Sequence, residues 1–402
     1  MTTRAGMERN LRLLPAYVAC SRSMVWLPTF VLFTRERFGL AGALQIAASA
    51  YLFIVVLEVP SGWMSDRVGR VATLRVAAAA FVVANLVLLF ASEQFLLVLF
   101  GQFFLSTGFA FLSGTDVSFH FDTLEQVGKS DEYVERESKV ASIGYLSTSV
   151  SVLLGGLLGL IDLRLPFLAA GLAGLAQLAI ALRLLEPPTT TIAPSIVRQL
   201  RKCIGYLRDR YLLWIFLYGI LMVTLEHVAF TLMQPWLTEV LNQSADDVGS
   251  TPLLAGVVMA IVAAVGALSA RNSARLSRSV GTVRALIGLA ALSAIVVTGM
   301  YAAAHVAVLA LVMFRSAQGA AAPVLISNET AKVVDKEQRA TFLSVNSLIG
   351  RLGYGLILVT TSLESGSDPR PVLGIFSSAS WIMVLVLVGS ALVLTGSRNI
   401  AN

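Results

Sequence analysis

The sequence predicts an all-α membrane protein in which twelve transmembrane helices form two pseudo-symmetric six-helix bundles around a central cavity. Three observations lead to this prediction. Of the 402 residues, 56% are hydrophobic and only 13% are charged, with a mean hydropathy of +0.78. Apolar runs long enough to cross a bilayer recur along the whole chain. A short polar motif of the first half returns in the second half at a fixed shift.

The composition excludes an ordinary soluble domain. Such a domain carries roughly 25% charged residues, and this chain has about half that fraction. A soluble fold of this composition would expose large apolar patches to water. In a membrane the apolar surface faces lipid instead of water, so this composition favours a membrane protein. The two cysteines, Cys20 and Cys203, lie far apart in sequence and predict neither a disulfide nor a metal site. The net charge of +6 needs no nucleic-acid partner, because basic residues of membrane proteins mark the cytoplasmic side.

Twelve apolar runs reach the roughly 20 residues that a spanning helix needs. The runs are continuously apolar, whereas the strands of an outer-membrane barrel alternate apolar and polar residues. Helices are therefore expected. The predicted spans cover residues 13–33, 42–61, 74–91, 95–115, 140–161, 165–184, 212–237, 252–270, 283–303, 306–327, 341–362 and 371–395.

The distribution of lysine and arginine predicts the orientation. With the N-terminus in the cytoplasm, 23 of the 30 basic residues fall on the cytoplasmic side, four on the other side and three inside spans. The positive-inside rule therefore places both termini in the cytoplasm. The protein is expected to be a multi-pass protein of the plasma membrane or of a bacterial inner membrane, with the lipid bilayer as its surroundings.

One long connection divides the chain into a bundle over 1–184 and a bundle over 212–402. Residues 185–211 open with EPPTTT and continue with apolar residues at helical spacing and with basic residues between them. This pattern predicts an amphipathic helix at the cytoplasmic interface. A solvated linker is the alternative. The apolar positions of the helix are Ile196, Leu200, Ile204, Leu207 and Tyr211.

The two halves contain a repeat. A shift of 212 residues places GWMSDRVGR (62–70) on ARLSRSVGT (274–282), and Gly69 then falls on Gly281. Both stretches follow the second span of their half. Internal repeats of this kind are typical of transporters built from two related halves.

The first copy of the repeat resembles the loop between spans two and three of the major facilitator superfamily, written G-x-L-x-D-R-x-G-R. The resemblance implies a secondary transporter with alternating access, and it implies that the aspartate–arginine cluster acts in gating. The alternative interpretation is that the arginines only provide the positive charge of a cytoplasmic loop. Such a loop requires neither the aspartate nor the two glycines. The matching residues are Gly62, Asp66, Arg67, Gly69 and Arg70.

Other stretches extend the resemblance. EVPSG (58–62), SGTD (113–116) and QRATFLS (338–344) are similar to a bacterial efflux-type subgroup, and Glu58 and Asp116 suit the gating network. Arg315 and Gly319 resemble the R-x-x-x-G motif that the superfamily more often carries in span four. The second copy of the repeat lacks the aspartate, because Arg278 stands there, so a symmetric second latch is not expected.

Four charged residues fall near the middle of predicted spans: Arg22, Glu226, Arg315 and Arg351. A charge at the bilayer centre costs roughly 2.5–3.5 kcal/mol on insertion scales, so these side chains are expected to face a wet cavity or one another. In one interpretation Glu226 binds a proton and the arginines hold a polar substrate group. In the other, Glu226 forms a permanent structural bridge with an arginine.

The sequence therefore predicts a proton-coupled exporter of a small amphiphilic molecule, acting as a monomer. A symporter importing an anionic metabolite is the alternative, favoured by three mid-span arginines against one glutamate. A membrane enzyme or a receptor is a further alternative of another class. The sequence shows no Ser-His-Asp grouping, no metal-spaced cluster and no phosphate-binding glycine loop. No enzyme activity, cofactor, metal or nucleic-acid partner is expected.

Overall fold

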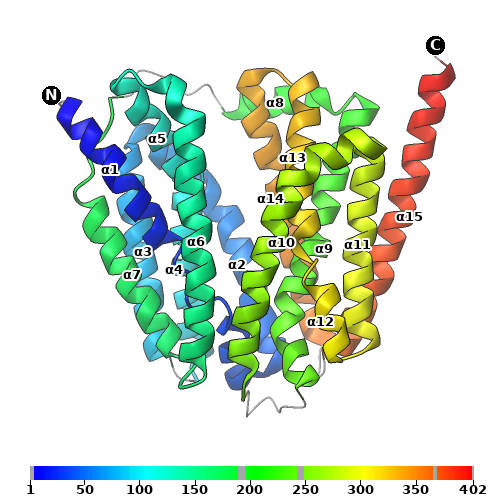
Figure 1. Ribbon diagram of the computed structural model, residues 1–402, viewed down its shortest axis with the longest axis horizontal. Helices are drawn as coiled ribbons and strands as arrows, with labels where there is room; N and C mark the ends of the chain where they lie inside the picture. Colours follow the sequence, from blue (N-terminus) through cyan, green and yellow to red (C-terminus); the bar gives the residue numbers. More distant parts are fainter. Residues whose placement is uncertain (1–3, 92, 189–195, 242–248, 365–368, 401–402) are drawn as a thin grey trace. The chain divides into compact units, whose positions relative to one another are not determined.

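The computed structural model describes residues 4–91, 93–188, 196–241, 249–364 and 369–400, and the regular elements within these ranges are all helical (Figure 1). Ten of the described helices are long and apolar enough to cross a membrane, and Leu165–Ala181 is a shorter apolar helix. These findings confirm the predicted all-α membrane fold. The predicted linker over 185–211 falls partly outside the described residues.

The chain divides into two compact units. The first contains Met1–Ala193 together with Ala245–Ala260, and the second contains Pro194–Ser244 together with Ile261–Asn402. Helix α10 contributes its first turns to the first unit and the rest of its length to the second. Each unit has its own apolar core.

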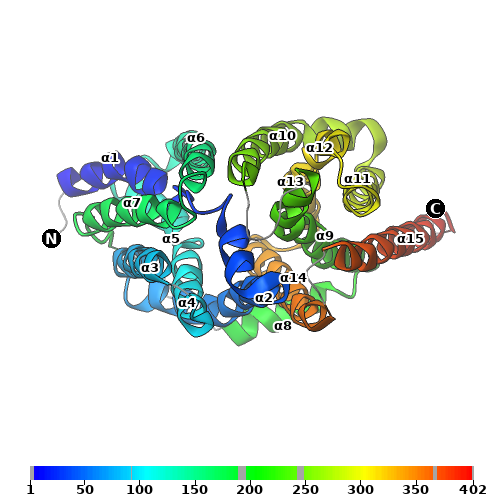
Figure 2. The same ribbon diagram turned by 90° about the horizontal axis from the view of Figure 1, so that it is seen from below.

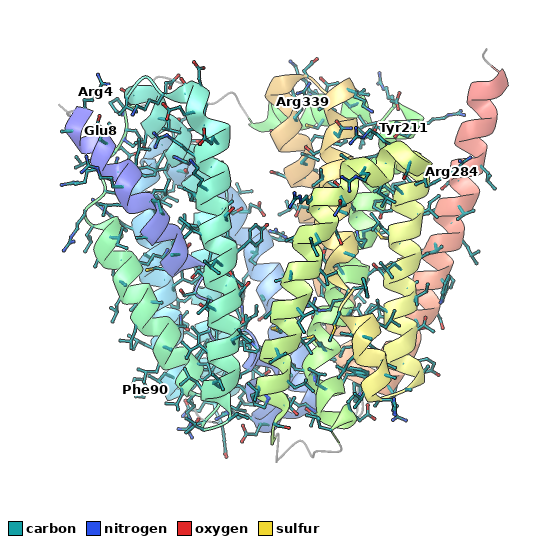
Figure 3. The ribbon with its side chains drawn as sticks, in the orientation of Figure 1. Arg4, Glu8, Phe90, Tyr211, Arg284 and Arg339 are labelled. Carbon is teal, nitrogen blue, oxygen red and sulfur yellow. The ribbon has the colours of Figure 1, made fainter. Side chains whose placement is uncertain are left out.

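In the first unit, α3 packs against α4 and α7, α2 packs against α4, and α1 packs against α6 and α7 (Figure 2). Arg4 pairs with Glu8 (3.8 Å) at the end of α1 away from Phe90, which ends α3 at the other end of this unit (Figure 3). The elements are α1 Arg4–Ser21, α2 Phe30–Arg67, α3 Arg70–Phe90, α4 Phe95–Leu112, α5 Thr115–Gln126, η1 Ser130–Glu132, α6 Tyr133–Gly159 and α7 Leu165–Ala181.

In the second unit, α9 packs against α11, α13, α14 and α15, and α11 packs against α15. Tyr211, Arg284 and Arg339 lie at the same end of this unit (Figure 3). The elements are α8 Ile196–Tyr206, α9 Arg210–Val240, α10 Thr251–Val280, α11 Thr282–Ala302, α12 Val306–Val312, α13 Ser316–Val333, α14 Lys336–Glu364 and α15 Arg370–Ile400.

Three of the predicted spans contain breaks that the apolar pattern does not show. The span predicted over 13–33 is divided, because α1 ends at Ser21 and α2 begins at Phe30. Span four ends at Leu112 and continues as α5 after Gly114, whose φ is +73°. Span ten is divided into α12 and α13, with Arg315 at the start of α13. Two predicted mid-span arginines, Arg22 and Arg315, therefore stand at helix breaks.

Helix α6 supports the break in span one. A broken helix leaves backbone carbonyls without an intrahelical donor, and two α6 hydroxyls donate to them. Ser147 Oγ lies 2.6 Å from the Ala19 carbonyl oxygen, and Thr148 Oγ1 lies 3.0 Å from that of Arg22. Gly155 of α6 packs directly on the Val25 carbonyl, where a side chain has no room. Gly155 thus allows α6 to pack closely against the broken segment.

The two units share internal features that agree with the predicted repeat. Tyr17 donates to the Leu74 carbonyl oxygen (3.0 Å) and Tyr218 to that of Leu286 (2.9 Å), in each case from the first predicted span of the half to the third. Both tyrosines are fully buried. The turns after α2 and α10 both pass through a glycine with positive φ, as described below.

We predict that Gly155→Ala destabilises the protein. The added methyl group meets backbone of the span-one break, which cannot turn aside as a side chain can. Overpacking of this kind costs roughly 1–3 kcal/mol, so the melting temperature of the purified protein should fall. Gly288→Ala is the control, because Gly288 lies in α11 with nothing within 4 Å of the added atom. Equal melting of Gly155→Ala and the wild type would contradict the packing described here.

Candidate functional site

The turn of the motif GWMSDRVGR joins α2 to α3. Helix α2 ends at Arg67, α3 begins at Arg70, and Gly69 between them has a φ of +128°. L-residues with a side chain rarely adopt this conformation, which glycine reaches freely. A Cβ atom at Gly69 would also lie 2.7 Å from Cδ of Glu186. Gly69 is therefore required both by the backbone and by its neighbour.

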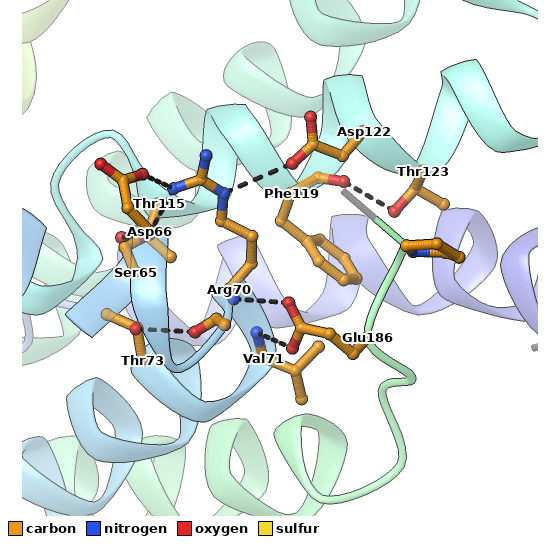
Figure 4. Close-up of polar contacts among 12 residues, drawn as sticks. Ser65, Asp66, Arg70, Val71, Thr73, Thr115, Phe119, Asp122, Thr123 and Glu186 are labelled. Atoms are coloured by element: carbon orange, nitrogen blue, oxygen red, sulfur yellow. Dashed lines mark hydrogen bonds and ion pairs between the residues drawn. The ribbon is translucent and has the colours of Figure 1, made fainter. Parts of the chain in front are cut away.

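Arg70 is the centre of a polar cluster at this turn (Figure 4). Its Nη1 donates to Ser65 Oγ (2.8 Å) and to Asp66 Oδ1 (2.7 Å), and its Nε donates to Asp122 Oδ2 (3.3 Å). Ser65 also accepts a hydrogen bond from Thr115 Oγ1 (3.2 Å). The guanidinium thus lies between two carboxylates and ties α2, α3 and α5 together at one end of the first unit.

Glu186 caps the start of α3, and the sequence analysis missed it. Its Oε1 accepts from the backbone N–H of Arg70 (2.6 Å) and its Oε2 from that of Val71 (2.8 Å) (Figure 4). The first N–H groups of a helix have no intrahelical partner and attract negative charge. The only signal in the sequence is an acidic residue directly after the sixth span. Which helix it reaches depends on the path of the chain.

The segment around Glu186 is held by further hydrogen bonds. Asn10 pairs with the backbone of Leu185 through both amide atoms, at 2.7 and 3.0 Å. Arg75 donates to three carbonyls at the end of α7, including that of Leu184 (3.2 Å). Gln126 Nε2 donates to the Pro188 carbonyl oxygen (3.0 Å). Residues 181–188 are thereby attached to α1, α3 and α5 beside the Arg70 cluster.

The structure separates the other predicted gating residues. Gly62 and Arg67 are exposed, and Glu58 is half-buried on α2. Asp116 accepts from the Val117 N–H (2.9 Å) at the start of α5 and lies within electrostatic reach of Arg22.

Asp122, and not Asp116, contacts Arg70. The helical spacing contains a signal for this choice: Thr115, Phe119 and Asp122 are separated by four and three residues and lie on one face of α5. Asp116 points about 100° away from Thr115.

The second copy of the motif forms a smaller cluster. Gly281 has a φ of +85°, in agreement with the repeat. Ser277 Oγ and Thr282 Oγ1 are 2.8 Å apart, and these positions correspond to Ser65 and Arg70 after the shift of 212. Thr282 donates to Glu329 (3.0 Å), which also accepts from Lys332 (2.7 Å). A threonine thus replaces the central arginine of the first copy.

The second unit contains a cavity of ≈ 230 Å³ between α9, α13 and α14. Its wall is mainly apolar, with four polar side chains that face it. This combination is typical of small-molecule sites, which are apolar with a few polar groups. The lining residues are Gly219, Met222, Val223, Glu226, Gln318, Gly319, Ala322, Pro323, Ile326, Leu343, Asn346 and Ser347.

Glu226 packs directly on the backbone of Gly319, where any side chain would collide with its carboxyl group. Arg315, one helical turn earlier, is only 8% exposed and has Glu226 as its opposite charge. Its guanidinium also lies 5.2 Å from the centre of the Phe230 ring. The R-x-x-x-G spacing therefore places an arginine beside the carboxylate and leaves room for the carboxylate itself.

The predicted cavity charges fall into both units. Glu226, Arg315 and Arg351 belong to the second unit, and both arginines lie within electrostatic reach of His227. His227 bonds the Val223 carbonyl oxygen (2.7 Å) through Nδ1. Arg22 belongs to the first unit, where its side chain is exposed and touches Gly144 of α6. Among the described residues, Arg315 Nε and Gln318 Oε1 are buried polar atoms without a hydrogen-bond partner.

The comparison with protein families agrees with this geometry. A family model described as Major Facilitator Superfamily matches residues 13–358. The match covers most of the chain, so the chain belongs to this superfamily. The resemblance read from the motif is thereby confirmed, and the chain is a transporter and not an enzyme. A search of curated proteins found no match.

Solved structures of transporters share the fold. A variant of the nucleoside transporter NupG has a TM-score of 0.79 at 13% identity, with 96% of this chain and 99% of that chain covered. A D-xylose-proton symporter has a TM-score of 0.65 at 14% identity, covering 96% and 97%. A POT family transporter in complex with 5-aminolevulinic acid has a TM-score of 0.70 at 13% identity, covering 98% and 97%. At these identities the likeness shows the fold alone.

We predict that Glu186→Ala destabilises the first unit. The change leaves two N–H groups at the start of α3 without their acceptor, and loss of a helix cap costs about 1 kcal/mol. The melting temperature should fall. Glu135→Ala is the control, because Glu135 is exposed and pairs with Lys139 on the surface, a kind of pair worth roughly 0–1 kcal/mol. The capping role is wrong if both variants melt alike.

Proposed function

We propose that this transporter exports a small amphiphilic molecule in exchange for protons, by alternating access. The observation that carries the proposal is Glu226, a carboxyl group at the wall of a mainly apolar cavity and beside a buried arginine. An apolar wall suits the apolar part of an amphiphile, and the polar groups on that wall suit its polar part. The carboxyl group supplies a place for a proton.

Glu226 is the group that we propose to carry the proton during the transport cycle. Burial favours the neutral form of a carboxyl group, and a nearby arginine favours the ionised form. A change in the distance between a carboxyl group and an arginine can therefore drive the binding and release of a proton, and we propose Glu226 and Arg315 as that pair. A carrier that opens to each side in turn can use that change to bind a proton on one side and release it on the other.

The Arg70 cluster supports the gating part of the proposal. Alternating access requires two states that differ little in free energy, so a single ion pair at a helix end can decide which state is populated. Asp66 is 41% exposed, and its carboxylate bonds Arg70 across the α2–α3 turn. It is well placed to be held in one state and released in the other.

Import by symport is the second candidate, and a specific observation favours it. Arg315 is buried with its Nε unpartnered among the described residues, so an anionic group could bind there. One of the similar structures is of a D-xylose-proton symporter, and another is of a nucleoside transporter.

We propose that the protein acts as a monomer in the plasma or inner membrane. We place both termini in the cytoplasm, because 23 basic residues lie on that side of the predicted topology and four lie on the other.

We predict that Asp66→Asn inserts normally but transports slowly. The substitution keeps the size of the side chain and removes the charge that Arg70 holds at 2.7 Å. The relative stability of the two access states then changes, and we expect turnover to fall about tenfold, which corresponds to about 1.4 kcal/mol. Turnover is measured as the uptake or release of a fluorescent amphiphile by proteoliposomes. Wild-type turnover in Asp66→Asn would show that this pair does not gate transport.

We predict that Glu226→Gln abolishes transport driven by a pH gradient while substrate exchange without a gradient continues. The amide keeps the shape of the site but cannot exchange a proton. Glu239→Gln is the control on the same helix, because Glu239 pairs with Arg370 (2.8 Å) and does not line the cavity. Proteoliposomes with an imposed pH gradient and a substrate panel give both the coupling and the direction of transport.

Two other outcomes of this experiment are informative. A permanent structural bridge predicts that Glu226→Gln folds and expresses poorly, because Arg315 is left buried without its opposite charge. Full response of a well-folded Glu226→Gln variant to the pH gradient contradicts proton coupling through this residue. In that case another ion or uniport becomes the interpretation.

A further inference from the structure

Helix α8 has two distinct faces. Cys203, Tyr206 and Leu207 pack against the protein, in a cluster with Leu212, Phe216, Val334 and Phe342. Burial raises the pKa of the Cys203 thiol. Tyr206 donates to Asp335 Oδ2 (2.6 Å), which fixes α8 to the turn between α13 and α14, and this bond raises the pKa of the phenol.

The opposite face of α8 is exposed. At 100° per residue, Arg201 and Ile204 lie about 60° apart on α8, and Arg201 lies on the side away from Cys203. Arg208 follows in the turn after Tyr206, where α8 ends. Ile204 is 68% exposed, and Arg201, Lys202 and Arg208 are exposed as well. The apolar stripe predicted from the sequence is therefore divided, because Leu207 packs on the protein while Ile204 does not. The exposed face combines one large apolar side chain with cations on both sides.

These cations have no carboxylate partners among the described residues. By contrast, two cations near the start of α6 pair with carboxylates one turn away: Arg136 with Glu132 (2.7 Å) and Lys139 with Glu135 (2.6 Å). The single acidic residue between 196 and 211 is Asp209, and it accepts from the Leu212 N–H (2.8 Å) as the cap of α9. The positive charge of α8 is thus left for a counter-ion from outside the chain.

The position of α8 favours the headgroup of an anionic phospholipid as that counter-ion. α8 ends at Tyr206 and the spanning helix α9 begins at Arg210, so α8 lies where a spanning helix emerges from the hydrocarbon layer. Headgroups of anionic phospholipids occupy this level and attract basic residues next to spanning helices. An apolar side chain among such cations inserts at the boundary of headgroups and acyl chains.

We propose that the exposed face of α8, together with Arg208 in the turn that follows it, is a binding site for an anionic phospholipid. Arg201 and Arg208 hold the phosphate, Lys202 adds charge at the edge of the face, and Ile204 enters the acyl layer. The proposal depends on the membrane fold alone and on neither the direction nor the coupling of transport. Lipid binding here anchors the helix that joins the two units along the chain.

Native mass spectrometry of the full chain tests this proposal, after purification from nanodiscs that contain equal amounts of phosphatidylglycerol and phosphatidylcholine. The wild type should retain phosphatidylglycerol in preference, and the double variant R201Q/R208Q should retain it at least fivefold less. R275Q/R278Q is the matched control, since it removes the same charge from the exposed end of α10. Equal retention by R201Q/R208Q and the wild type overturns the proposal, and so does an equal loss in the control.

Two further variants separate lipid binding from folding. R201K/R208K keeps the charge and should retain most of the lipid, whereas Ile204→Asn keeps all the cations and should retain two- to threefold less. Melting temperatures of all variants in detergent should equal that of the wild type, because the substituted side chains are exposed. A lysine variant that binds as poorly as the glutamine variant, or a loss of lipid that follows a loss of stability, contradicts a headgroup site.

Discussion

A backbone inside lipid must satisfy its own hydrogen bonds, and much of this structure follows from places where a spanning helix fails to do so. Span one opens after Ser21, and the carbonyls that it exposes are met by hydroxyls of α6. This requirement explains why α6 presents Ser147 and Thr148 toward the break and why Gly155 follows two turns later. A helix with bulky apolar residues on that face could not approach the broken segment.

The same requirement shapes the polar end of the first unit. The start of α3 needs an acceptor, and Glu186 supplies one for two N–H groups. The end of α7 needs donors, and Arg75 supplies them. Glu186 accepts hydrogen bonds from α3, and Arg75 of α3 donates to carbonyls at and after the end of α7. The segment after α7 is therefore fixed beside the Arg70 cluster. The chain that leaves the first unit is therefore attached to the turn that carries the superfamily motif.

The sequence was sufficient to predict the fold class, because length and apolar composition identify membrane helices. It was also sufficient to predict the turn glycines, because the repeat aligns Gly69 with Gly281. The sequence also singled out Glu226 and Arg315 as mid-span charges; in the structure Glu226 lines the cavity of the second unit, and Arg315 is buried within electrostatic reach of it. The helix breaks were not predictable, since hydropathy averages over about 20 residues and a break depends on a few. Asp122 and Glu186 were missed for a related reason: their partners lie 52 and more residues away in sequence.

The two units share helix contacts and turn glycines but differ in their polar contacts. Tyr17 and Tyr218 make the same contact, and both motif turns pass through a glycine, so the helices of each unit are positioned alike. The polar side chains then diverge. The first unit places an arginine between two carboxylates at its end, where the second has Thr282. The second places a carboxylate and an arginine inside its core. A charge at a helix end responds to movement of helices, and a charge at a cavity wall responds to what occupies the cavity. In the proposed mechanism, this divergence separates control of access from recognition of ligand and proton.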